Sequence, residues 1–484
     1  MMQSGLRPGL AAGIAILSLA VASPVSADTL REALSQAYRT NPTLEGSRAQ
    51  QRALDETVPI ERAAGLPSVN AQATHVEFVK NSSNSFTSPE RAFSADLNLG
   101  VPIYSGGAVK NSVRAAKNRV EAGQADLRAT ESAIFSQVVA AYMDVIQNEA
   151  IVGLSSNQVD VLGVNLQATS DRFEIGDLTR TDVAQSQARL ALAEGNLRSA
   201  RANLVSARET YIQLVGEAPT NLQPPPPLPN LPDSPQDAVA IALDFNPDLI
   251  AAKERVDAAQ NEIDVAGSTR LPTVEIFSTG GYNDYFGTLG GPTSSQFDQT
   301  ETTAQVGVRA SIPLFQGGRP AALRRQAQAL AAAQMEQVIE VERDVIAQVR
   351  AAYSSWRASL ALIESSQVAV DAAELSLEGV RAENSVGNRT ILDILDAEQE
   401  LLDTQVRLVQ ARRNAYVAGF SLLAAMGRAE ARDLNLDGGV LYDPEVNYRR
   451  VRGKWFDWDN DPAPVAQSTR TVDTPAQDGS IQSD

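Results

Sequence analysis

The sequence has no cysteine, a single histidine and few aromatic residues, and each scarcity excludes a class of protein. Without cysteine the chain can form neither disulfides nor thiolate metal sites, and it cannot carry a lipid on an N-terminal cysteine. The one histidine, His75, has no metal-ligating partners nearby in sequence. Aromatic residues make up 5% of the chain and hydrophobic residues 43%, a balance that favours long, tightly paired helices over a thick globular core.

The patterns typical of enzymes and of nucleic-acid-binding proteins are also missing. There is no nucleophile elbow, P-loop, HExxH motif or Cys/His cluster. We therefore expect no enzymatic activity, no cofactor and no bound metal. The formal net charge of −18 disfavours nucleic acid and anionic lipid as partners, because both carry negative charge themselves.

Residues 1–27 resemble a cleaved export signal. Arg7 supplies a positive start, Leu10–Ala22 is an apolar run too short to span a bilayer, and Val25-Ser26-Ala27 offers small residues for a signal peptidase. We expect the mature chain to begin at Asp28. No later apolar run approaches the roughly 18 to 20 residues of a membrane helix. This predicts either a soluble periplasmic protein or one that enters the outer membrane through β-strands.

The second half of the chain repeats the first. Asn41-Pro42 recurs as Asn246-Pro247, and Pro102-Ile103-Tyr104 recurs as Pro313-Leu314-Phe315. The offset grows between these two matches, which places an insertion in the loop-like stretch GTLGGPTSSQ. The predicted organisation is a signal peptide at 1–27, repeat 1 at 28–223, a proline-rich linker at 224–235, repeat 2 at 236–436 and an acidic, partly disordered tail at 437–484.

Each repeat is predicted to contain one hairpin and two long helices. Apolar and polar residues alternate over 93–103 and 304–312, and a weaker strand precedes each, which predicts hairpins at about 69–103 and 274–312. Apolar residues spaced seven apart, such as Val138, Val145 and Val152, are typical of a coiled-coil seam. The predicted long helices span about 108–174 and 319–385, and the return helices about 180–215 and 390–426.

Four strands are too few to close a membrane barrel, since the smallest known barrels have about eight. Because an open sheet edge is not tolerated in lipid, the strands must be shared between chains. Two chains would give a barrel filled by its own side chains, whereas three would leave a lumen. We therefore expect an α+β membrane protein, a trimer whose 12-stranded β-barrel (four strands per chain) continues into a long α-helical coiled-coil tunnel, with His75 on a strand near the lumen or rim.

This layout resembles the TolC family of outer-membrane channel-tunnels from about Leu30 to Leu436. The residues that carry the resemblance are the two Asn-Pro pairs, the strand-to-helix junctions VPIYSGG and IPLFQGG, and the turn segments Phe173–Gln187 and Asn384–Gln399. The resemblance implies a homotrimer in the outer membrane of a Gram-negative bacterium, embedded in its lipid. It also implies a periplasmic adaptor (a membrane fusion protein) and an inner-membrane RND or ABC transporter as partners.

The second turn segment holds a candidate gate. Asp393 and Asp396 lie three residues apart, so both fall on one helix face, and in a threefold tube they would form two rings that favour cations. Repulsion between close carboxylates would raise some of their pKa values. The resemblance places the family's aspartate gate here, and it implies a lock in which Arg389 holds Thr181 and Asp182, with Asn384 where the family's best-known member has an aromatic residue. The turns at Gly176 and Gly387 are the expected adaptor contacts.

Two alternatives stay open at this stage. One is a soluble periplasmic coiled-coil scaffold or adaptor, which would have to cover the apolar face of its strands. Within the channel hypothesis, multidrug efflux and type I secretion are not distinguished, because the inner-membrane pump selects the cargo. Trp455, Phe456 and Trp458 in the tail are expected to dock on the body of the protein or to contact a partner, and the tail after Asp459 is expected to be disordered.

Overall fold

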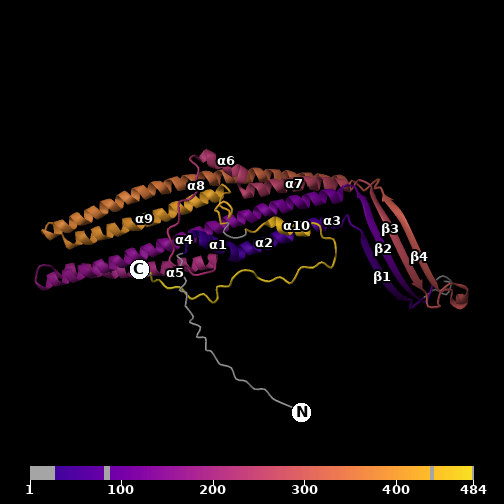
Figure 1. The fold of residues 1–484 in the computed structure, drawn as a ribbon, viewed down its shortest axis with the longest axis horizontal. Helices are drawn as coiled ribbons and strands as arrows, with labels where there is room; N and C mark the ends of the chain where they lie inside the picture. Colours follow the sequence, from indigo (N-terminus) through magenta and orange to yellow (C-terminus); the bar gives the residue numbers. More distant parts are fainter. Residues whose placement is uncertain (1–27, 81–87, 437–440, 482–484) are drawn as a thin grey trace, which may run out of the picture.

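The computed structural model describes residues 28–80, 88–436 and 441–481. Figure 1 shows an elongated body in which long helices run side by side and a small sheet extends from one end. The helices are α1 (Leu30–Thr40), α2 (Pro42–Asp55), α3 (Thr57–Ala63), α4 (Ala108–Glu174), α5 (Arg180–Val215), α6 (Pro235–Phe245), α7 (Pro247–Ser268), η1 (Gly291–Gln296), α8 (Arg319–Ser385), α9 (Ile391–Ala425) and α10 (Pro444–Val451). The strands are β1 (Ser68–Glu77), β2 (Arg91–Ser105), β3 (Thr273–Asp284) and β4 (Thr300–Ser311). The signal-peptide prediction falls outside the described residues.

The four strands form one antiparallel sheet in the order β1-β2-β3-β4, so β1 and β4 are its edges. Each hairpin lies within a residue or two of its predicted range. The register gives the sheet one apolar and one polar face, because paired residues share a face: Val69 lies opposite Leu99, whereas Asn70 lies opposite Asn98. The predicted insertion lies between β3 and β4 and contains η1, a short 3₁₀ helix that the sequence did not suggest.

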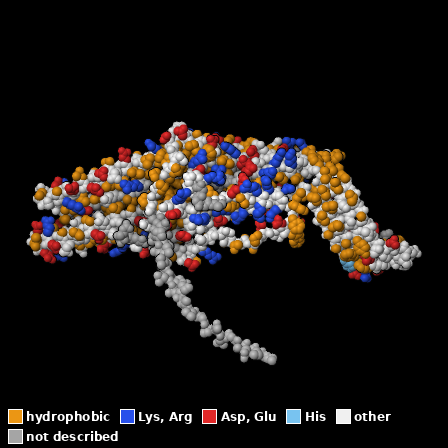
Figure 2. Space-filling view, in the orientation of Figure 1, with side chains coloured by type: hydrophobic (Ala, Val, Ile, Leu, Met, Phe, Trp, Pro, Cys, Tyr) orange, Lys and Arg blue, Asp and Glu red, His pale blue; other side chains and the backbone are white. Residues whose placement is uncertain are grey.

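The apolar face of the sheet is uncovered within the described part of the chain. Leu97 of β2 is 53% exposed, and Val306 and Val308 of β4 are 78% and 68% exposed. Figure 2 shows the hydrophobic side chains continuing along the sheet away from the helical body. A water-soluble domain of this size would cover such a face, because exposed apolar strands favour aggregation.

Two pairs of antiparallel helices make up the body. The long helices α4 and α8 have 67 residues each, and the return helices α5 and α9 have 36 and 35. A 67-residue helix is about 100 Å long. The predicted seam is buried along its middle, where Val138 and Val145 are inaccessible and Val152 is 2% exposed. No described helix is both long enough and apolar enough to cross a bilayer.

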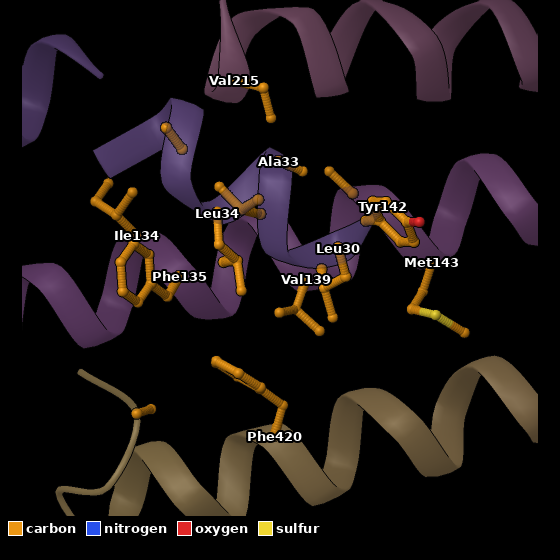
Figure 3. Close-up of a cluster of buried hydrophobic side chains, with 14 of the residues drawn as sticks. Leu30, Ala33, Leu34, Ile134, Phe135, Val139, Tyr142, Met143, Val215 and Phe420 are labelled. Carbon is orange, nitrogen blue, oxygen red and sulfur yellow. The ribbon is translucent and has the colours of Figure 1, made fainter. Parts of the chain in front are cut away.

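The main core lies midway along the body, where α1 packs against the α4–α5 pair. Figure 3 shows Leu30 and Leu34 of α1 against Phe135 and Tyr142 of α4, with Phe420 of α9 on the other side. Phe135 and Tyr142 are completely buried. Burying an aromatic side chain of this size contributes about 1.5 to 3 kcal/mol. These contacts therefore hold the short N-terminal helix α1 against α4.

The repeated Asn-Pro pairs have the same structural role in both halves. Asn41 caps α2 by accepting hydrogen bonds from the backbone at Thr43 and Leu44, and its amide donates to the carbonyl of Leu214 at 3.0 Å. Asn246 caps α7 in the same way and donates to the carbonyl of Ala425 at 3.0 Å. Each asparagine therefore caps the start of one helix and donates a hydrogen bond to a backbone carbonyl in the last turn of a return helix. The proline that follows stands at the first helical position, where the backbone amide would have no partner within the helix.

The C-terminal segment at 441–481 covers most of the predicted tail. It contains α10, whose N-cap Asp443 accepts from the backbone amide of Glu445, and the residues beyond it run along α5. Arg208 of α5 donates to the carbonyls of Asp478 and Ser480, both at 2.9 Å. Within the described chain the three tail aromatics do not dock on the body, because these side chains are 62% to 80% exposed.

Candidate functional site: the helix tips

Both helical pairs reverse through the same kind of turn at the end farthest from the sheet. Gly176 follows α4 with φ of +82°, and Gly387 follows α8 with φ of +80°. This left-handed conformation costs glycine little, and it lets the next amide reach back to the last turn of the helix. The amide of Asp177 donates to the carbonyl of Arg172, and that of Asn388 to Glu383, both at 2.9 Å. The two glycines proposed from sequence are therefore the turn residues of the tips.

The first helical turn after each reversal is closed by a capping box. Thr390 starts α9, and its backbone amide and hydroxyl donate to the carboxylate of Asp393 at 2.8 and 2.7 Å. Thr179 and Asp182 form the same pair at the start of α5, at the same two distances. The candidate gate residue Asp393 and the candidate lock residue Asp182 are thus each part of a capping box within the single chain.

These hydrogen bonds favour the ionised form of Asp393 and of Asp182. Hydrogen bonds from the Thr390 hydroxyl and backbone amide lower the pKa of Asp393, and Arg389 adds a smaller effect in the same direction. Hydrogen bonds from Thr179 lower the pKa of Asp182 in the same way. Within one chain, the pKa of Asp393 therefore moves in the direction opposite to that expected from carboxylate repulsion, because the cap stabilises the ionised form.

Asp396 has a partner that the sequence analysis missed. Arg189 of α5 donates a hydrogen bond from Nη2 to Oδ1 of Asp396 on α9, at 2.5 Å. This ion pair joins the two return helices of one chain close to the tips. Arg189 occupies the position in the first half that Glu400 occupies in the second, so a charge reversal between equivalent positions was the available signal.

The residues of the expected lock are not brought together within one chain. Arg389 donates from Nε to Glu383 at 2.7 Å, and its Nη1 lies 3.6 Å from Asp393, so its contacts lie within its own turn. Asn384 donates to the carbonyl of Arg389 at 2.7 Å and thereby braces the turn. No contact of Arg389 with Thr181 or Asp182 is present within the described chain.

A second missed pair lies deeper in the α8–α9 hairpin. Arg381 of α8 pairs with Glu398 of α9, whose side chain is only 5% exposed. The first half has instead a hydrogen bond between the buried hydroxyls of Ser186 and Thr169, at 3.3 Å. The α8–α9 hairpin is therefore joined by an ion pair whose carboxylate is buried and whose arginine is half exposed, whereas the α4–α5 hairpin has a hydrogen bond between two neutral side chains in the same region. Within the described chain, no group of His, Asp and Glu side chains is arranged to hold a metal ion.

Long helical pairs closed by tight acidic tips, joined to a short sheet with an uncovered apolar face, define a channel-tunnel protein rather than an enzyme. The outer membrane efflux protein family model matches residues 33–217 and 238–428, and the chain belongs to this family, which includes TolC. The outer membrane efflux protein BepC of Brucella suis is 34% identical over 431 residues, covering 89% of this chain and 91% of that protein. TolC of Escherichia coli is 28% identical over 481 residues, covering 94% of this chain and 95% of that protein.

Solved structures agree with this fold. The structure of CusC has a TM-score of 0.72 at 19% identity and covers 83% of this chain and 92% of that one. The structure of VceC from Vibrio cholerae has a TM-score of 0.70 at 22% identity, with coverage of 82% and 96%. The protein is an outer-membrane exit duct for efflux or secretion, with its helical tunnel in the periplasm. The soluble scaffold alternative has no support from these relatives.

Proposed function

We propose that three copies of this chain form the exit duct of a tripartite efflux pump or type I secretion system. The observation that carries this proposal is the open sheet, whose edge strands β1 and β4 are unpaired and whose apolar face is uncovered in the described chain. In lipid every backbone group at a sheet edge needs a partner, so β1 of one copy would pair with β4 of the next. Three copies give a closed twelve-stranded barrel with a polar lumen.

At the opposite end, the tips would form the gate. Asp393 and Asp396 from three chains would make two acidic rings that favour cations and bind multivalent cations across the axis. The Arg189–Asp396 ion pair would hold α9 against α5 in the closed state. Arg389, Thr181, Asp182 and Asn384 lie on the same tips, and a contact of Arg389 with Thr181 and Asp182 would have to form between neighbouring chains.

The partners of such a duct are a periplasmic adaptor and an inner-membrane transporter of the RND or ABC class. The exposed turns at Gly176 and Gly387 are the surfaces that an adaptor would contact first, because they are the most distant points from the membrane. Relatives are named both for efflux and for secretion: the alkaline protease secretion protein AprF of Pseudomonas aeruginosa is 28% identical over 330 residues, 67% of each chain. The cargo is therefore either small molecules or protein.

Cysteine cross-linking tests the shared barrel directly, because the natural chain has no thiol. Gln72→Cys on β1 would be combined with Gln305→Cys on β4, both on the polar face, and treated with a short bifunctional thiol reagent. Neighbouring copies should be linked into species of up to three chains. The matched control replaces Gln305→Cys with Val306→Cys, which faces the opposite side of the sheet. Linked species that stop at two chains, or the absence of any linked species, would overturn the trimeric barrel.

A further inference from the structure

Residues 450–461, which begin in the last turn of α10 and continue beyond it, form a closed loop that we call the aromatic loop. Arg450 at its start donates to both carboxylate oxygens of Asp461 at its end, at 2.7 and 2.8 Å. Lys454 lies 3.1 Å from Asp459 and 3.7 Å from Asp461, inside the same loop. Arg450 belongs to the last turn of α10 and also donates to Asn447 of that helix at 2.8 Å, so its bonds to Asp461 connect the end of the loop to α10. A bidentate arginine–carboxylate pair fixes the relative orientation of the two side chains as well as their distance. The two ends of this loop are therefore held in a defined arrangement.

The loop presents three large aromatic side chains to the outside. Trp455 is 76% exposed, Phe456 is 62% exposed and Trp458 is 80% exposed. The rings of Trp455 and Phe456 pack edge to face with centroids 6.4 Å apart, so the side chains form one patch. Leaving such a patch in water is unfavourable, since each of these side chains can bury about 150 to 250 Å².

The patch lies at the level where the helical body meets the sheet. Arg62 of α3 donates to the carbonyl of Arg452 in the loop at 3.2 Å, and the chain enters β1 only a few residues after Arg62. In Figure 1 the segment that follows α10 reaches toward the base of β1. The apolar face of the sheet is exposed at this base, where Val69 is 63% and Tyr104 is 47% exposed.

The charge of the loop also fits a membrane surface. It contains three basic and three acidic residues, so it carries no net charge, whereas the whole chain carries −18. Arg450 pairs with Asp461, and Lys454 lies near both Asp459 and Asp461, so these four side chains neutralise one another within the loop. A neutral loop with tryptophan at its surface is suited to the boundary between lipid headgroups and water, where amphipathic indole rings are enriched.

From this placement we propose that the aromatic loop anchors each chain in the periplasmic leaflet of the outer membrane, with Trp455, Phe456 and Trp458 inserted among the lipid headgroups beside the barrel. This inference rests on the proposed function, because it requires the sheet to span the membrane. The anchor would fix the depth of the barrel and take the place of a lipid on an N-terminal cysteine, which this chain lacks.

Tryptophan fluorescence tests the anchor, because the chain has only Trp356, Trp455 and Trp458. The full-length Trp356→Phe variant reports on the loop, and the double variant Trp455→Phe/Trp458→Phe reports on Trp356 in the helical body. Both would be reconstituted into phosphatidylcholine vesicles containing lipid brominated either near the headgroup or near the end of the acyl chain. We expect the loop tryptophans to be quenched by shallow bromine and spared by deep bromine and by aqueous iodide. Trp356 should be spared by both brominated lipids.

Two other outcomes would overturn the anchor. Quenching by iodide but by neither brominated lipid would place the loop in water. Protection from iodide and from both lipids would mean that protein covers the patch, either a second copy or an adaptor. The channel current of the same vesicles separates this inference from the proposed function: a conducting protein with unquenched loop tryptophans refutes only the anchor, whereas the absence of conductance refutes the barrel.

Discussion

Arg189 and Asp396 lie on the two return helices of one chain, and their side chains meet at 2.5 Å. This ion pair ties one candidate gate residue to the neighbouring helical pair without any second copy of the protein. Each aspartate of the candidate gate thus has its own constraint, since Asp393 is held by Thr390 and Asp396 by Arg189. In the proposed gate, opening of the tips would require separation of the Arg189–Asp396 pair.

Replacing Arg189 should loosen the closed tip. The ion pair is partly exposed, so one pair contributes about 0.2 to 1 kcal/mol, and three pairs in a trimer would contribute up to about 3 kcal/mol to the closed state. We expect Arg189→Gln to raise the resting single-channel conductance in planar bilayers. Arg198→Gln is the matched control, because Arg198 lies on the same helix and pairs only with Glu194 of its own helix, at 3.5 Å. Equal conductance in the two variants would show that the pair does not hold the gate.

The two gate aspartates should differ when each is made neutral. Asp393→Asn weakens the cap of α9 as well as one acidic ring, whereas Asp396→Asn frees Arg189 and leaves the cap intact. We expect each variant, which keeps one of the two acidic rings, to show weaker cation selectivity and weaker block by a trivalent cation added from the tunnel side. Only Asp393→Asn should speed hydrogen exchange in the first turn of α9. Unchanged block in both variants would move the gate to another part of the tunnel.

Selectivity due to Asp393 should persist in mildly acidic solution. The cap lowers the pKa of Asp393 in the folded chain below the ordinary aspartate value. The ionised carboxylate therefore stabilises the folded tip at any pH above the ordinary value, and this stabilisation is lost only as the pH falls through the lower folded pKa. We expect the cation preference of the Asp396→Asn channel, measured by reversal potential, to stay constant between about pH 7 and pH 5. A preference that declines in this range would mean that repulsion within the ring dominates over the cap.

Glu131 on α4 should make stability depend on pH. Burial raises its pKa to about 7, and Glu430 acts in the same direction, while the Ala431 amide and Arg48 oppose the shift. The folded pKa lies above the unfolded one, so this stabilisation is complete below about pH 4.5 and is lost as the pH rises through about 7. The difference amounts to about 3 kcal/mol. In thermal unfolding from pH 4.5 to 8, we expect Glu131→Gln to lose less stability than the natural chain.

Glu364→Gln is the matched control for that measurement, because Glu364 is an exposed carboxylate on α8. Its replacement leaves the surroundings of Glu131 unchanged. It should show the same pH profile as the natural chain. A flat profile in the natural chain itself would mean that Glu131 stays ionised with the help of Arg48 and Arg128.

Equivalent tyrosines of the two repeats donate hydrogen bonds to the backbone near the two ends of the proline-rich linker. The Tyr142 hydroxyl lies 2.6 Å from the carbonyl of Gln223, and the Tyr353 hydroxyl lies 2.7 Å from that of Asp233. Tyr142 is completely buried, so Tyr142→Phe removes a hydrogen bond made by a buried side chain and should destabilise the protein by about 1 to 2 kcal/mol. Tyr353→Phe should cost less, because water can replace its more exposed bond. Denaturant unfolding measures both, and equal losses would contradict this ranking.

The sequence was sufficient for features that depend on spacing along the chain. Seven-residue spacing predicted the seam through Val138 and Val145, and alternation predicted both hairpins, because each pattern reflects which side of one element is buried. The Thr-x-x-Asp caps could also have been read from the sequence, since a capping box is local. Asp393 was instead interpreted only as a free gate carboxylate.

Features that depend on the crossing of distant elements could not be predicted. The Arg189–Asp396 pair requires α5 and α9 to approach near their tips, and no sequence period encodes that approach. The path of the C-terminal segment along α5 likewise involves contacts of Arg208, which lies on a helix far away in sequence. The polar composition of α10 concealed a helix that is stabilised largely by packing and by the bond from Asn447 to the buried Asp55, at 2.7 Å.

The capping boxes and glycine turns at the two tips have a mechanical consequence. Each tip satisfies its own backbone donors and acceptors through Thr179, Thr390 and the residues beside Gly176 and Gly387. If the tips open as proposed, each could move as an intact unit, and the accompanying bending would be distributed along the coiled helices behind it. An adaptor that pulls on one tip would then act at the end of a long lever, where a small change in helix curvature produces a large displacement at the axis.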